Sequence, residues 1–183
     1  EDINPKKFLP SSRSVAFRKD IWKQIGGYPS WLDYSEDVVF DKNIIRRYGN
    51  FHFMPNAIVK FKPRGTFKQF AKQYYNYASG DGHAGLFFHI HFIRYFTYLI
   101  AIPLSLYAAL TVNYLLWLLG IIAGLFYIRR PIMRSNFLFK HLPILDFIKI
   151  ILLIPLIRIV GDLAKMAGYP VGLWKRINNK KPI

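Results

Sequence analysis

The chain contains no cysteine, which excludes disulfides and zinc sites built on thiolates. Acidic residues are also scarce: 10 Asp and Glu stand against 26 Lys and Arg, giving a net charge of +16. Such an excess indicates an anionic partner, either nucleic acid or anionic lipid headgroups. The basic residues cluster beside apolar stretches, as at Arg129-Arg130 and Lys175-Arg176, and the sequence has no nucleic-acid-binding motif. We therefore expect membrane lipids, and not nucleic acid, as partners.

Charge is absent altogether from the run between Tyr95 and Ile128. One straight helix of that length would measure about 50 Å, whereas the hydrocarbon core of a bilayer is roughly 30 Å thick. Two shorter helices that turn near Thr111-Val112-Asn113 fit better. Arg94 and Arg129 flank the run, so the positive-inside rule places both ends in the cytoplasm. We expect residues 83–130 to form a transmembrane hairpin of a multi-pass inner (plasma) membrane protein whose soluble part is cytoplasmic; the alternative is a buried hairpin in a large soluble core.

Residues 131–183 are apolar but interrupted. The interrupting residues in the apolar stretch are Asp146, Lys149, Pro155 and Arg158. An amphipathic helix at the membrane interface, followed by a basic tail from Asn178 to Ile183, explains this pattern better than a third span. The third span stays open as an alternative.

Residues 1–82 have the pattern of an incomplete soluble α/β domain. Helices are predicted over Asp20–Ile25 and Asp37–Tyr48, and from Thr66 to the Gly80-Asp81-Gly82 stop. Short strands are predicted over 14–17, 51–53 and 57–61. The segment has no Gly-rich phosphate loop, and it is too short for the repeated strand–helix units of a nucleotide-binding domain.

An acidic pair, Glu36-Asp37, opens the second predicted helix. The positive end of the helix dipole keeps a carboxylate ionised there, and an ionised carboxylate can take the proton of a sugar hydroxyl as that hydroxyl attacks. The competing interpretation is ordinary helix capping, with Ser35 or Asp37 as the cap. Spacing alone favours capping.

Several other residues have two interpretations. Trp31 could stack on a sugar ring, or it could pack on its own domain. Gln73 and Asn76 could reach a diphosphate or an acceptor, or they could belong to an amphipathic surface helix. Three histidines raise the possibility of a metal site: His83, His89 and His91. Their apolar flanks favour interfacial histidines instead, and we expect no metal ligands in this chain.

Short motifs follow one another along the chain: Leu9 to Arg18, Gly26-Gly27-Tyr28-Pro29, Glu36 to Asp41, Gln73 to Tyr77, Gly80-Asp81-Gly82, and Gly161 to Gly172. Their order and spacing resemble the C-terminal half of bacterial membrane-associated family 2 glycosyltransferases. The resemblance covers nearly the whole chain. It implies that residues 1–82 are the C-terminal, acceptor-side part of a GT-A-type α/β catalytic domain.

The resemblance also implies an activity. It predicts inverting transfer of a sugar from a nucleotide-sugar donor to a membrane-associated acceptor, lipid-linked or a polysaccharide, with Asp37 as general base and Glu36 as its partner. It implies a divalent metal, Mg or Mn, with ligands in a donor-binding half outside this chain. The residues given substrate-binding roles are Gly27, Tyr28, Trp31, Gln73 and Asn76.

Two departures from the family pattern leave a second hypothesis open. Asn76 and Tyr77 replace the arginine and tryptophan of a Gln-x-x-Arg-Trp-like element, and no Asp-x-Asp motif precedes Ser11. The chain is therefore expected to be a fragment of an enzyme. The alternative is a truncated, non-catalytic membrane anchor or partner subunit.

Overall fold

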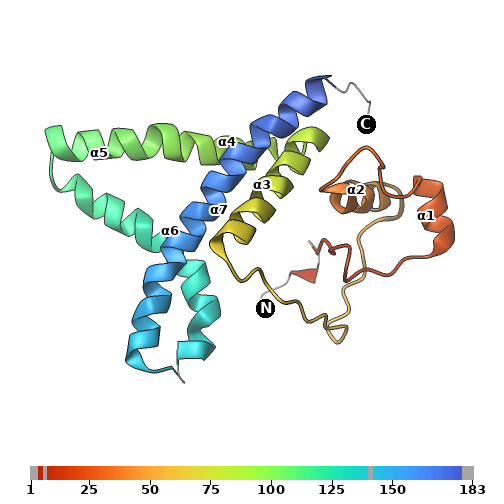
Figure 1. Cartoon of the computed structure of the whole chain (residues 1–183), viewed down its shortest axis with the longest axis horizontal. Helices are drawn as coiled ribbons and strands as arrows, with labels where there is room; N and C mark the ends of the chain where they lie inside the picture. The colour runs from red at the N-terminus through yellow and green to blue at the C-terminus, as the bar shows by residue number, and fades with distance from the viewer. Residues whose placement is uncertain (1–3, 6–7, 140–141, 179–183) are drawn as a thin grey trace.

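A computed structural model describes residues 4–5, 8–139 and 142–178 of the chain (Figure 1). The helices are α1 (Lys19–Ile25), α2 (Glu36–Tyr48), α3 (Phe67–Ala84), α4 (Phe88–Phe96), a π-helical turn η2 (Thr97–Ala101), α5 (Ile102–Thr111), α6 (Leu116–Phe139) and α7 (Ile144–Asn178). No strand occurs within these described ranges. The predicted α/β class, with its partial GT-A-like domain, is therefore wrong, and the described chain is helical with irregular loops.

The three segments predicted as strands are irregular because a strand needs a neighbour with which to exchange backbone hydrogen bonds. Their aromatic residues pack as individual side chains instead. The ring of Phe17 lies 5.0 Å from that of Phe40 on α2, and the ring of Phe53 lies 5.0 Å from that of Phe8. Phe17 and Phe53 thus hold irregular loops in place, whereas the apolar residues of 57–61 are exposed.

Two predicted helices of the N-terminal part are confirmed. α1 ends where Gly26 adopts a left-handed conformation with φ of 86°. α2 buries one apolar face, with Phe40 fully buried and Ile44 6% exposed, whereas Tyr48 at its end is half exposed. Gly49 follows α2, as the sequence predicts.

α3 begins as predicted but runs further. The Thr66 hydroxyl accepts a hydrogen bond from the backbone N–H of Gln69 at 3.3 Å, which caps the helix. The Gly80-Asp81-Gly82 sequence continues the helix, which ends at Gly85 with φ of 68°. A Cβ on Gly80 would lie 2.4 Å from the Tyr34 carbonyl oxygen, so this glycine serves close packing and not helix termination.

α3 and α7 form the most extensive helix pair of the described chain and cross at its centre (Figure 1). Their backbones touch at glycines. A Cβ on Gly168 would lie 2.1 Å from the Tyr75 carbonyl oxygen, and one on Gly172 would lie 2.0 Å from that of Ser79. Small residues permit such close approach of two helices. The C-terminal half of α7 is therefore a partner of α3, a role that the predicted interfacial helix did not include.

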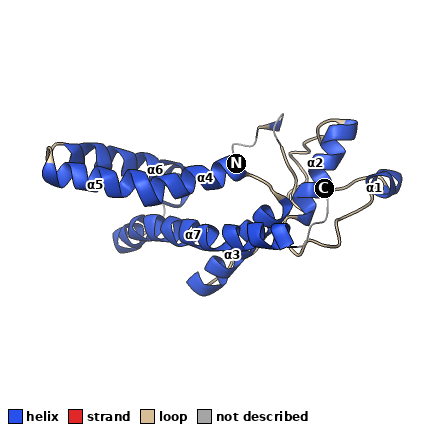
Figure 2. Cartoon of the chain, turned by 90° about the horizontal axis from the view of Figure 1, so that it is seen from above, coloured by secondary structure: helices blue, strands red, loops and turns tan. Residues whose placement is uncertain are grey.

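Two helical stretches are long and apolar enough to cross a membrane: Phe88–Thr111, formed by α4, η2 and α5, and Leu116–Ser135 of α6. Only 6% and 0% of their apolar windows are buried in the protein, so their side chains face outwards. The chain reverses between them at residues 112–115, at the expected position. Figure 2 shows α5 and α6 extending together from the rest of the molecule, an arrangement suited to membrane association.

The α3–α7 contact gives a direct test. Gly172→Ala places a methyl group against backbone atoms that cannot move aside, and we expect the free energy of unfolding to fall by about 1–3 kcal/mol. The control is Gly124→Ala in α6, where a Cβ meets nothing within 4 Å and the better helix propensity of alanine should leave stability equal or slightly raised. Thermal unfolding in detergent, followed by circular dichroism, measures both. Equal effects of the two substitutions would contradict the proposed contact.

Candidate functional site

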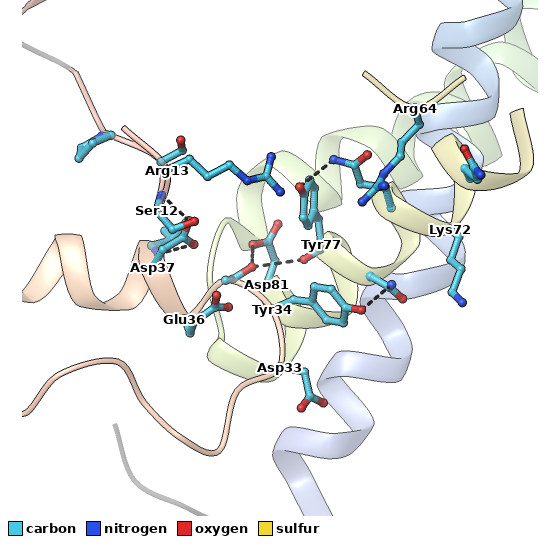
Figure 3. Close-up of a pocket in the computed structure, with 17 residues that line it drawn as sticks. Ser12, Arg13, Asp33, Tyr34, Glu36, Asp37, Arg64, Lys72, Tyr77 and Asp81 are labelled. Atoms are coloured by element: carbon cyan, nitrogen blue, oxygen red, sulfur yellow. Dashed lines mark hydrogen bonds between the residues drawn. The ribbon is translucent and has the colours of Figure 1, made fainter. Parts of the chain in front are cut away.

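An open cleft of about 790 Å³ lies between the N-terminal loop, the start of α2 and one face of α3 (Figure 3). Its carboxylates are those of Asp33, Glu36, Asp37 and Asp81. Its basic side chains are those of Arg13, Arg64 and Lys72. Figure 3 shows Glu36 and Asp37 at the start of α2 on one side of the view, with Arg64 and the α3 residue Lys72 on the other. The cleft therefore offers groups that accept protons and groups that bind anions.

Asp37 is held in place by backbone N–H groups. Its Oδ1 accepts a hydrogen bond from Val38 at 2.9 Å, and its Oδ2 accepts one from Ser12 at 3.2 Å. The second bond ties the N-terminal loop to the start of α2 (Figure 3). Glu36 lies beside Asp37 and also lines the cleft. Asp37 is the second residue of α2, so its bond from the Val38 N–H lies within the first turn and is not an N-cap bond.

Ser35 does not act as a side-chain cap. It precedes α2 in a left-handed conformation, with φ of 64°. Its hydroxyl instead donates a hydrogen bond to Asp81 Oδ1 on α3 at 2.9 Å. The residue before the acidic pair is therefore fixed by α3, and a helix distant in sequence sets the position of Glu36 and Asp37.

Gln73 and Asn76 line the cleft, as their predicted binding roles require. The Asn76 amide donates a hydrogen bond to the Tyr34 hydroxyl at 2.8 Å, and the Gln73 amide donates one to the Tyr77 hydroxyl at 2.7 Å. These bonds hold two phenol groups along the wall of the cleft. Asn76 thus links α3 to the loop before α2, a role that needs no positive charge.

The other residues given binding roles lie outside the cleft lining. Trp31 packs edge-on against His83 at 5.0 Å between ring centroids, beside a small apolar cluster. Tyr28 packs against Phe40 at 4.7 Å. Gly27 is buried with φ of 71°. The structure brings Glu36, Asp37, Gln73 and Asn76 together and leaves these three apart; their binding roles stay predictions.

Asp41 lies one turn after Asp37 and is 1% exposed. Its Oδ2 has no hydrogen-bond partner within the described part of the chain. Burial, with a smaller contribution from the negative charge of Asp37, raises the pKa of Asp41 from 3.8 to about 7. Burial and the charges of Asp41, Asp37 and Glu36 likewise raise the pKa of Tyr28. Ionisation of the buried Asp41 carboxyl above neutral pH is therefore unfavourable for the folded protein.

Sequence reasoning missed several residues of this site. Asp81 was assigned to a helix stop, although an acid between two glycines inside a helix is unusual enough to mark a packed polar site. His91 was expected at an interface, yet it is 3% exposed and bonded to Asp81. The basic side chains of Arg13, Arg64 and Lys72 come from separate segments, and no local pattern joins them.

The divalent metal implied by the resemblance finds no ligand set in the part of the chain that the structure describes. No three His, Cys, Asp or Glu side chains there come close enough to hold an ion. Both oxygens of Asp37 already accept backbone hydrogen bonds.

Comparison with known proteins returns nothing: no family matches the chain, and no curated protein or solved structure is significantly similar to it.

The buried Asp41 carboxyl predicts a dependence of stability on pH. Because its pKa is raised in the folded state, the folded protein keeps a proton that the unfolded chain has lost between about pH 4 and pH 7, and stability falls as the pH rises through this window. The shift corresponds to at most about 4 kcal/mol. Asp41→Asn removes the titrating carboxyl group. The melting temperature of the variant relative to that of the wild type should therefore rise between pH 5 and pH 8. Parallel melting temperatures across this range would contradict the assignment.

Proposed function

We propose that this chain is the acceptor-side and membrane-bound part of an inverting glycosyltransferase, which transfers a sugar from a nucleotide-sugar to a membrane-associated acceptor. The observation that carries the proposal is the cleft itself. It brings Asp37 and Glu36 together with polar side chains of α3, in a chain that also has two helical stretches long and apolar enough to cross a membrane. A membrane-associated acceptor suits this combination.

The proposed chemistry uses one carboxylate of this chain. Asp37 takes the proton of an acceptor hydroxyl while the hydroxyl oxygen forms its bond to the anomeric carbon of the donor. The bond from that carbon to the nucleoside diphosphate breaks on the opposite side, so the configuration inverts. The bonds from Ser12 and Val38 fix Asp37 for this task, because they orient the carboxylate before substrate arrives.

The basic side chains suit the acceptor or the leaving group. Arg13 and Arg64 line the same cleft as the acids, and Lys72 follows on α3. Guanidinium and ammonium groups bind phosphate oxygens through charge-assisted hydrogen bonds. In this proposal, the three basic side chains supply the positive charge of the family arginine that Asn76 replaces. A phosphate-bearing acceptor, such as a lipid-linked saccharide, fits this arrangement.

The proposed location is the inner membrane with the cleft in the cytoplasm. Arg94 and Arg129 flank the uncharged run from Tyr95 to Ile128, which includes the turn at residues 112–115. Both ends of the hairpin would then lie on the side where nucleotide-sugars are made.

The test is Asp37→Asn in the complete protein, in membranes from its source. Loss of a general base lowers turnover by about 10²- to 10⁴-fold, so transfer of radiolabelled sugar from nucleotide-sugars to membrane acceptors should fall by that factor. The matched control is Asp20→Asn, an exposed acid of α1 paired with Arg18, which should keep wild-type transfer. Membrane insertion and melting temperature must match the wild type in both variants.

One observation favours the second candidate, a non-catalytic anchor or partner subunit. Because both oxygens of Asp37 accept backbone hydrogen bonds, this side chain also has a structural role. If Asp37→Asn keeps sugar transfer but lowers the melting temperature, the carboxylate is a structural cap and the enzyme assignment fails. If Asp37→Asn loses sugar transfer while its melting temperature is unchanged, the result supports the enzyme assignment.

A further inference from the structure

A chain of polar side chains leads from the cleft into the base of the apolar helices. It begins at Asp81, which accepts the Ser35 bond through Oδ1. Its other oxygen, Oδ2, lies 3.3 Å from Nε2 of His91 on α4. His91 is buried and stacks on Tyr169 of α7 at 3.9 Å between ring centroids. A side chain of the first apolar stretch thus holds a carboxylate of the cleft.

The next contact sets the hydrogen-bonding roles of the two ring nitrogens of His91. Arg94 Nη1 lies 3.2 Å from Nδ1 of His91. Because a guanidinium only donates hydrogen bonds, Nδ1 is the acceptor and the ring proton is on Nε2. His91 therefore donates to Asp81 and accepts from Arg94, and both ring nitrogens are used. The ring cannot turn without breaking both bonds.

Asp162 of α7 completes this series of hydrogen-bonded side chains. Its Oδ1 accepts a hydrogen bond from Arg94 Nε at 2.8 Å, with the two side chains 16% and 13% exposed. Its Oδ2 accepts hydrogen bonds from Tyr127 of α6 at 2.7 Å and from Tyr98 of η2 at 3.2 Å. One carboxylate thus joins both apolar stretches to α7.

Each member of this network depends on its neighbours. A charged group that is largely buried is costly unless it is paired and hydrogen-bonded, so Arg94 and Asp162 hold one another in place. Hydrogen bonds in such a chain also strengthen one another. Arg94, His91 and Asp81 thus form an unbroken series of contacts between Asp162 and the Ser35 hydroxyl.

We infer that Asp162 is a positioning residue for the cleft: through Arg94, His91 and Asp81 it couples the placement of the membrane hairpin to the loop that presents Glu36 and Asp37. The coupling goes beyond the proposed reaction and does not depend on it. The geometry of the cleft then depends on the orientation of the hairpin in a bilayer, or on a ligand bound between the hairpin and the cleft.

The absence of cysteine allows the coupling to be measured without substrate. Spin labels on Asp33→Cys in the cleft loop and Val112→Cys at the hairpin tip, both exposed positions, report the distance between the two parts in nanodiscs by pulsed electron paramagnetic resonance. We expect a broader or shifted distance distribution in Asp162→Asn. Asp146→Asn, which removes an exposed acid paired with Lys149 on the same helix, should leave the distribution unchanged.

A double-mutant cycle separates coupling from two local defects. Ser35→Ala and Asp162→Asn act at opposite ends of the hydrogen-bonded network. If the network is connected, the change in melting temperature of the double variant should differ from the sum of the two single changes by at least about 2 °C. If Asp162→Asn does not fold, Tyr127→Phe, which removes a single hydroxyl from Asp162, takes its place in both measurements. An unchanged distance distribution together with additive melting temperatures would overturn the inference, whatever the outcome of the sugar-transfer assay.

Discussion

The close approach of α3 and α7 is the constraint on which the rest of the structure depends. Gly168 and Gly172 let the backbone of α7 touch that of α3, where any side chain would hold the helices apart. This contact fixes α3 along its C-terminal half. Every polar group that α3 presents to the cleft is therefore placed by a contact on its opposite face.

Helical periodicity explains how one helix serves both sides. Tyr75 and Ser79, four residues apart, turn their backbone towards α7, whereas Asn76 and Tyr77 line the cleft and Gly80 receives the Tyr34 loop. The loop before α2 docks on α3 through Gly80 and through the Ser35 bond to Asp81. The acidic pair is thus positioned by packing on a helix far along the chain.

The apolar helices impose the second constraint. Almost none of their side chains is buried in the protein, which is stable where lipid replaces water. Arg94 of the first stretch pairs with Asp162 of α7, whose carboxylate also accepts hydrogen bonds from Tyr98 and Tyr127. The contact that neutralises two largely buried charges therefore also ties both apolar stretches to α7.

The sequence by itself determined the features that depend on neighbouring residues. A glycine marks the end of each of α1 and α2, and a threonine marks the start of α3. These signals are local, because the groups that cap a helix bond within a few residues of its end. The uncharged run predicted two apolar helices with a turn near Asn113, because the need to avoid charge in lipid acts on every residue.

Only the tertiary structure decided which of those features act together. The segments predicted as strands have no strand to pair with among the described residues and form irregular loops. Gly80 and Gly82 break a helix in isolation, yet here they permit contact and α3 continues through them. His91 meets Asp81, and Arg94 meets Asp162 from a distant part of the chain. Local patterns hold no information on such meetings, because the free energy of a buried hydrogen bond or a backbone contact comes from the partner that folding brings to it.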